Sequence, residues 1–251
     1  MNIKTNLFVI SAISVFLCGC AGDPVALSKI VKDKDAYFNQ YFSKQSLSES
    51  VIKKIPLDEN ARVFNNTKLV FETKSTSGDK VVKRKQIWNY SGLGNGLIQI
   101  ETEFVSNDIT TGYNFSLNYK GLNNIKWVFA SAATGYSDMP YELKEVNHWD
   151  KLGIKVGDIS TVDFNWGTVV QIMNYHDGQY KCTLTKVLEA NELLPTLSGQ
   201  ARQFDCQTVN NGSISLRSKY AYLVDLGFAI PIELTSADFK TEFNLLEINN
   251  P

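Results

Sequence analysis

The sequence predicts a mainly β protein of the α+β class, with one curved antiparallel sheet of about ten strands in a half-barrel or barrel-like shape. Three observations favour this fold. Aromatic residues make up 12% of the chain, a composition typical of strands. Apolar and polar side chains alternate with a period of two through much of residues 67–234. The alternating runs are separated by short turns, so consecutive strands should pair antiparallel.

Two helices are expected beside the sheet. Residues 26–42 place most of their apolar side chains on one side, which predicts an N-terminal helix. Residues 139–152 predict one inserted helix, because Pro140 stands in its first turn, Leu143 and Val146 begin an apolar stripe, and a glycine follows.

The strands are expected at residues 68–75, 81–91, 97–105, 113–119, 126–133, 161–166, 168–175, 179–188, 201–209, 213–225 and 228–234. A hairpin centred on Leu93 would set Lys83 opposite Glu103 and Lys85 opposite Glu101. Such pairing predicts a solvated face of ion pairs rather than a carboxylate pair for acid–base catalysis.

The first twenty residues have the order of a secretory signal. Residues 1–6 carry Lys4 and no acidic residue, residues 7–17 are apolar or small, and residues 18–22 are all small. The apolar run is about half as long as a membrane-spanning helix requires.

Leu17-Cys18-Gly19-Cys20 resembles the lipobox of bacterial lipoproteins, although that family usually has Ala, Ser or Thr where this chain has Cys18. The resemblance implies cleavage before Cys20 and acylation of that cysteine, which would anchor the protein stably in a membrane. An ordinary cleaved signal without lipid is the alternative. An aspartate directly after the lipidated cysteine resembles a signal for retention in the inner membrane. This chain has Ala21 at that position, so we expect the outer membrane.

The expected organisation is a signal peptide at residues 1–19, a lipidated tether at 20–25 and a single β-rich periplasmic domain at 26–251. Residues 1–19 contain one lysine and no acidic residue, so cleavage takes the net charge from −1 to −2. This near-neutral charge argues against nucleic acid as a partner. The expected partners are the membrane, through the N-terminal lipid, and envelope proteins or a hydrophobic ligand.

Cys182 and Cys206 are the cysteines that remain after residue 20. Each shares a strand face with apolar residues, and the periplasm is oxidising, so we expect a disulfide between them. No CxxC motif and no histidine cluster accompanies them, so the sequence predicts no metal site.

The search for catalytic chemistry yields no nucleophile elbow, no zinc motif and no phosphate or dinucleotide loop. His148 and His176 are the two histidines of the chain, and each is expected to be a surface residue. The sequence therefore predicts no catalytic residue and no cofactor.

Aromatic residues that point inward would line a cavity or fill a core. The expected set is Tyr113, Phe115, Trp127, Phe129, Tyr220 and Tyr222. A curved sheet with helices over its mouth resembles the half-barrel of periplasmic lipoprotein carriers, in architecture only.

Three classes of function stay open. A non-enzymatic structural or protein-binding role is favoured, and it predicts a filled interior. A carrier or sensor of a lipid-like ligand predicts an aromatic-lined cavity. A hydrolytic enzyme would require one of the histidines to meet a carboxylate in a cleft.

Overall fold

A computed structural model describes residues 23–58, 61 and 63–249, and all that follows concerns these residues. The predicted signal peptide and Cys20 lie outside them. No helix in the described part is long and apolar enough to cross a membrane.

The predicted N-terminal helix is present as two short helices that break at Asp33, followed by a 3₁₀ turn and a third helix. Their bounds are α1 Leu27–Lys32, α2 Lys34–Tyr41, η1 Lys44–Ser46 and α3 Glu49–Ile52. Asp33 caps α2, because its side chain accepts a hydrogen bond from the backbone N–H of Ala36.

Thirteen strands follow within the described residues, more than the ten or so expected. They are β1 Val63–Ser77, β2 Lys80–Gly94, β3 Leu97–Ser106, β4 Ile109–Tyr119, β5 Asn123–Ser131, β6 Tyr136–Ser137, β7 Tyr141–Trp149, β8 Ile159–Thr168, β9 His176–Glu189, β10 Gln200–Asn210, β11 Ser213–Leu223, β12 Phe228–Thr235 and β13 Lys240–Asn249. A second 3₁₀ turn, η2 Ala190–Glu192, joins β9 to β10.

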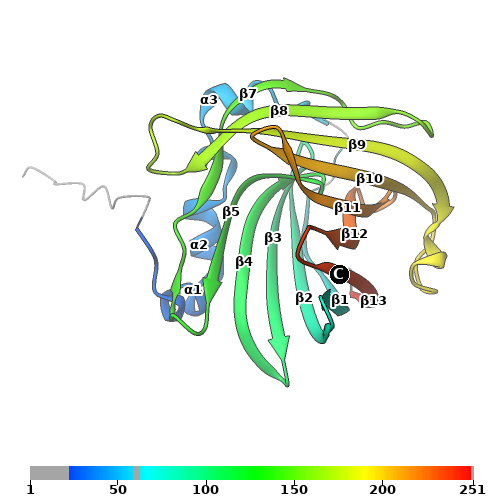
Figure 1. Cartoon of the computed structure of the whole chain (residues 1–251), viewed down its shortest axis with the longest axis horizontal. Coiled ribbons are helices and arrows are strands. Elements are labelled where there is room, and N and C mark those ends of the chain that lie inside the picture. The colour runs from blue at the N-terminus through cyan, green and yellow to red at the C-terminus, as the bar shows by residue number, and fades with distance from the viewer. Residues whose placement is uncertain (1–22, 59–60, 62, 250–251) are drawn as a thin grey trace, which may run out of the picture.

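The strands form a closed antiparallel circuit, so of the two expected shapes, half-barrel or barrel-like, the barrel is the one present. Their order is β4-β3-β2-β1-β13-β12-β11-β10-β9-β8-β7-β5, and β5 pairs with β4 to close twelve strands. In Figure 1, strands β1–β4 form the lower wall, β7–β10 cross the upper part, and the three helices lie at the left.

The predicted helix at 139–152 is wrong, because this segment is strand β7. Leu143, Val146 and Trp149 stand three residues apart, a spacing that resembles a helix. The pairing of β7 with β8 shifts register between Leu143 and Glu145, and again between Val146 and His148. Each bulge adds one residue to the period of two, which produces the misleading spacing of three.

The predicted register of the β2–β3 hairpin is also wrong. Lys85 lies opposite Val105, four residues from the expected Glu101. The turn is Asn95-Gly96, both with positive φ, rather than the glycines around Leu93. Asn-Gly is the dipeptide that best suits such a tight hairpin turn.

The charged residues of this hairpin consequently have other partners. Lys83 pairs with Glu72 at 3.6 Å, and Glu101 pairs with Lys34 of α2. The segment expected as a strand at residues 168–175 is instead mostly the loop between β8 and β9.

Candidate functional site: an aromatic wall inside the barrel

The inner face of the barrel can be assigned from contacts across it. Tyr90 of β2 stacks on Phe228 of β12 with 4.6 Å between ring centroids, although β1 and β13 separate these strands in the circuit. Cross-strand pairs then carry the same face from Tyr90 to Ile100, from Ile100 to Ser116, and from Ser116 to Trp127. Residues opposite one another share a face of the sheet, so Trp127 also points inward.

Six partly exposed aromatic residues follow one another along the paired strands β2, β3, β5, β7 and β8. We call them the aromatic belt: Trp88, Phe104, Trp127, Phe129, Tyr141 and Trp166. Phe129 is 40% exposed. Trp127 and Trp166 pack in part against the buried cluster beneath the helices, and Trp88 packs against the cluster of β1–β3 and β10–β13, so each ring is covered on one side and reached by solvent on the other.

The belt is densest where β5, β7 and β8 meet. The ring of Trp127 lies 5.7 Å from Tyr141 and 5.8 Å from Trp166, and Trp166 lies 4.7 Å from the ring of His176. Rings in such tilted or offset contact stabilise one another by about 1 kcal/mol per pair. The four rings, three belt residues and the imidazole of His176, therefore form a preformed aromatic surface.

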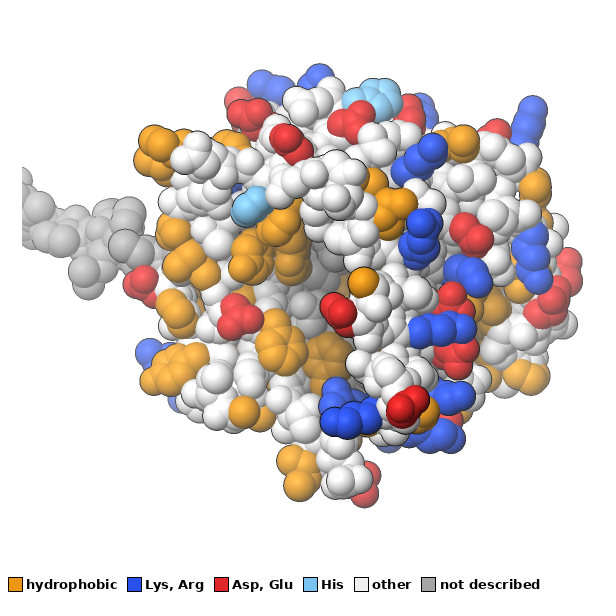
Figure 2. Space-filling model, in the orientation of Figure 1, with side chains coloured by type: hydrophobic (Ala, Val, Ile, Leu, Met, Phe, Trp, Pro, Cys, Tyr) orange, Lys and Arg blue, Asp and Glu red, His pale blue; other side chains and the backbone are white. Residues whose placement is uncertain are grey.

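The opposite end of the same wall is packed. Tyr90, Ile98 and Ile100 are at most 3% exposed and join a cluster with residues of β1 and β10–β13. Figure 2 shows the surface hollowed near its centre, with hydrophobic side chains along the wall of this central hollow. The interior is thus solid at one end and open at the other.

Polar groups on the inner wall are largely engaged with one another. The indole N–H of Trp88 donates to Gln86 Oε1 at 2.8 Å, and Asn118 Nδ2 donates to Ser116 Oγ at 2.8 Å. The hydroxyl of Tyr90 donates to the carbonyl oxygen of Ala229 at 3.2 Å. The indole N–H of Trp166 in the belt, by contrast, is buried and has no hydrogen-bond partner among the described residues.

Three buried tyrosines stay neutral well above physiological pH. Burial raises the pKa of Tyr90, Tyr180 and Tyr220, in each case as the largest effect. Their hydroxyl groups therefore stay protonated at physiological pH.

The barrel closes beside the belt through a short seam. Strands β5 and β7 pair at two positions, Lys126 with Glu142 and Trp127 with Tyr141. Glu142 also binds two lysines, at 3.4 Å from Lys126 Nζ and 2.8 Å from Lys144 Nζ. Burial lowers the pKa of Lys126, and the carboxylate of Glu142 opposes this effect.

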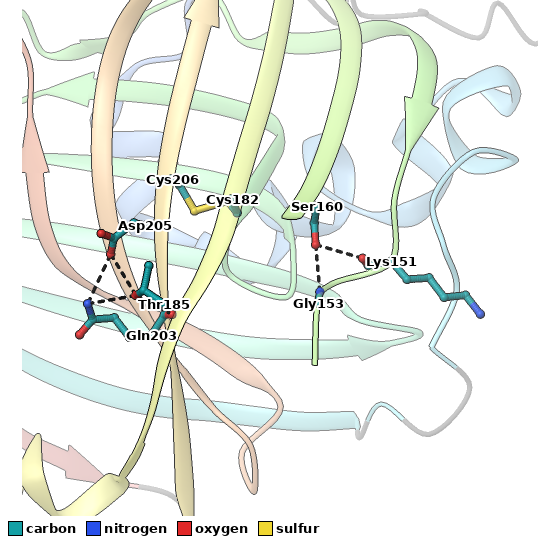
Figure 3. The surroundings of a disulfide bond; sticks show 8 residues. All are labelled: Lys151, Gly153, Ser160, Cys182, Thr185, Gln203, Asp205 and Cys206. Carbon is teal, nitrogen blue, oxygen red and sulfur yellow. Dashed lines mark hydrogen bonds between the residues drawn. A yellow bond between two sulfur atoms is a disulfide. The ribbon is translucent and has the colours of Figure 1, made fainter. Parts of the chain in front are cut away.

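The predicted disulfide is present. Cys182 of β9 and Cys206 of β10 lie directly opposite each other, and their sulfur atoms are bonded. Figure 3 shows the bridge across the two strands, together with the polar group of Thr185, Gln203 and Asp205 on the same strands. The two cysteines are 5% and 7% exposed, and they pack with Leu184, Phe204 and Tyr222.

The six aromatic residues expected to line a cavity lie in three places. Trp127 and Phe129 belong to the belt. Tyr113 and Phe115 lie on the outer face of β4 beneath the helices, where the ring of Phe115 is 5.2 Å from Tyr37. Tyr220 and Tyr222 pack in or against the cluster around the disulfide.

Four belt residues were not in the expected set: Trp88, Phe104, Tyr141 and Trp166. Trp88 and Phe104 occupy alternate apolar positions of predicted strands, so the alternation carried a signal for them. Tyr141 stood in the segment interpreted as a helix, which hid its place on a strand.

The two histidines lie apart from any enclosed acid. His148 is 54% exposed by side chain and its Nε2 lies 2.8 Å from Asp150 Oδ1, on the surface. His176 stacks on Trp166 at the edge of the belt. Among the described residues, no group of three His, Cys, Asp or Glu side chains is placed to hold a metal ion.

No family model and no curated protein matches this chain. One solved structure is similar: a β-barrel-like protein of domain of unknown function DUF1849 from Brucella abortus. The two chains are 8% identical, with a TM-score of 0.41, and the match covers 76% of this chain and 100% of the other.

Proposed function

We propose that this protein is a lipid-anchored protein of the bacterial envelope that binds a lipid-like ligand in the central hollow of its barrel. The observation that carries the proposal is the aromatic belt: six inward rings remain partly exposed in a barrel whose other end is packed. An apolar wall of this kind gains free energy by burying hydrocarbon, at roughly 25 cal/mol per Å².

The chemistry of the wall favours an acyl chain over a sugar. Carbohydrate sites also use aromatic rings, but they need free donors and acceptors for the sugar hydroxyls. Here Gln86, Ser116 and Asn118 hydrogen-bond within the wall, and the indole N–H of Trp166 is the one buried belt donor without a partner among the described residues. The residues of the belt carry no charge, so the buried part of the ligand should be neutral and apolar.

The anchor is proposed from the lipobox-like segment that ends at Cys20. A diacylglycerol on this residue would keep the barrel within reach of the membrane from which a lipid-like ligand comes. Mass spectrometry of the mature N-terminus tests the anchor independently of the barrel, and an unmodified amino terminus would contradict it.

Ligand binding can be tested with cis-parinaric acid, a fluorescent fatty acid, titrated into the full chain. We expect saturable binding that weakens about ten-fold in Phe129→Asp, which costs the bound state about 1.4 kcal/mol by placing a charge in the belt. Phe129 is partly exposed, so the folded state should tolerate the change.

The matched control is Ile109→Asp. Ile109 is 68% exposed at the start of β4, outside the belt, and should leave binding unchanged. Absence of saturable binding, or equal binding by the two variants, would reject the ligand role. The competing proposal, a structural or protein-binding role, would then be preferred.

A further inference from the structure

The loop between β8 and β9, residues 169–175, presents the most exposed apolar side chains of its region. Ile172 is 79% exposed, Met173 63% and Val170 54%. No acidic or basic residue occurs between Trp166 and His176. Adjacent, uncharged and exposed hydrophobic residues are unusual on a surface that faces only water.

The loop is braced so that its apolar side chains point out while its polar groups turn in. Gln171 Nε2 donates to the carbonyl oxygens of Met173 at 3.1 Å and Asn174 at 2.7 Å, and its Oε1 accepts from the N–H of Thr168 at 3.3 Å. A loop with satisfied carbonyls can enter an apolar medium at lower cost than one with free carbonyls.

The base of the loop is connected to the N-terminal end of the described chain. The N–H of Val169 donates to Pro140 O at 2.9 Å, and the N–H of Ser137 donates to Val25 O at 2.9 Å. Pro140 stands three positions after Ser137, a span of at most about 11 Å. The loop therefore starts close to Val25, five residues after Cys20 in the sequence.

The loop also adjoins the aromatic belt. Trp166 precedes it and His176 follows it, and their rings are in contact at the edge of the belt. Figure 1 shows this loop at the left edge of the molecule, where the described chain also begins.

The loop at the other end of β8 provides a contrast. Ile154 and Val156 are 63% and 61% exposed, but Lys155 stands between them and Asp158 follows. Burying these charges in an apolar medium would be costly. The ten residues of β8 separate the two loops by roughly 33 Å.

We propose that the loop at residues 169–175 inserts into the interface of a lipid bilayer and sets the open end of the hollow against the membrane. Interfacial segments bury their apolar side chains about 5–10 Å deep, and aromatic residues such as Tyr175 and Trp166 commonly flank them. The direction of the membrane rests on the anchor proposed at Cys20. The apolar side chains of the loop and its internal hydrogen bonds are independent of that anchor.

The test uses the full chain in vesicles of phosphatidylethanolamine and phosphatidylglycerol. Ile172→Cys carries a nitrobenzoxadiazole label, and Ile154→Cys carries the same label as the matched control at the other end of β8. A chain without an added cysteine reports any labelling at Cys20. Lipids with a spin label on the acyl chain then quench a fluorophore that lies in the bilayer.

We expect quenching at residue 172 to exceed that at residue 154 by roughly two-fold or more, since only the uncharged loop should reach acyl-chain depth. Equal quenching at both positions, or none at 172, would overturn the inference. The mass of the mature N-terminus, read on the same samples, separates the two proposals. Quenching at residue 172 without lipid on Cys20 would support insertion of the loop and contradict the proposed anchor.

Discussion

Glu142→Gln should open the weakest part of the barrel. The β5–β7 seam has two paired positions, and Glu142 is the counter-charge for Lys126 and Lys144, whose side chains are 6% and 10% exposed. Removing one partner of a buried ion pair costs about 3 kcal/mol, because a buried charge is left uncompensated. For a domain of this size that lowers Tm by roughly 6–12 °C.

The matched control is Glu49→Gln. Glu49 and Lys53 form an exposed pair at 3.3 Å, with 83% and 68% of the side chains accessible. Loss of this pair should change stability by less than about 1 kcal/mol. Urea unfolding of both variants measures the difference, and equal, small effects would refute the importance of the seam.

The pH dependence gives a second check on Glu142→Gln. Burial lowers the pKa of Lys126, and without Glu142 this pKa falls further. When the pKa of a lysine is lower in the folded than in the unfolded protein, the charged lysine destabilises the fold at every pH below the folded pKa. This penalty is relieved as pH rises from the folded pKa toward the unfolded pKa of about 10.4. The stability gap between variant and wild type should therefore narrow from neutral pH to pH 10. A constant gap would contradict this explanation.

Three further predictions concern the barrel. Replacing Cys182 and Cys206 together by Ser should cost about 3.5 kcal/mol in urea unfolding, because a loop with 24 residues of separation is no longer closed; a loss under 1 kcal/mol would contradict this. Gly178→Ala should cost about 1–3 kcal/mol in the same assay, since a Cβ there would lie 2.3 Å from the ring of Phe164; an unchanged midpoint would show that the ring moves freely. Burial raises the pKa of Tyr180, so its contribution to stability is present below pH 10 and is lost as pH rises further; ultraviolet titration should show this tyrosine ionising only when the protein unfolds, and reversible ionisation near pH 10 in the folded state would contradict it.

Alternation identified most strands but not which side of each faces inward. Phe115 pairs with Val128, so Trp127 and Phe129 lie on the opposite face from Phe115. The expected cavity set combined these two faces, because the pairing between β4 and β5 is not visible in either strand alone. Helix α2 then covers Phe115, so the apolar face of β4 packs beneath the helices, while Asn114, Ser116 and Asn118 lie on the face that Trp127 shares.

Local turn chemistry and bulges account for the other differences. The dipeptide Asn95-Gly96 indicates the β2–β3 turn, but the turn was predicted at Gly92 and Gly94 instead. The bulges of β7 depend on its pairing with β8 and could not be read from β7 alone. The disulfide was predictable, because the compartment expected from the signal-like segment and the apolar strand neighbours both favoured one pair.

Native mass spectrometry of the full chain, extracted from its membrane in mild detergent, tests the central proposal most directly. The account predicts a population that carries the additional mass of one acyl-chain molecule, reduced in Phe129→Asp and retained in Ile109→Asp. A chain that carries no lipid-like molecule, and that also fails to bind cis-parinaric acid, would contradict a ligand role for the aromatic belt.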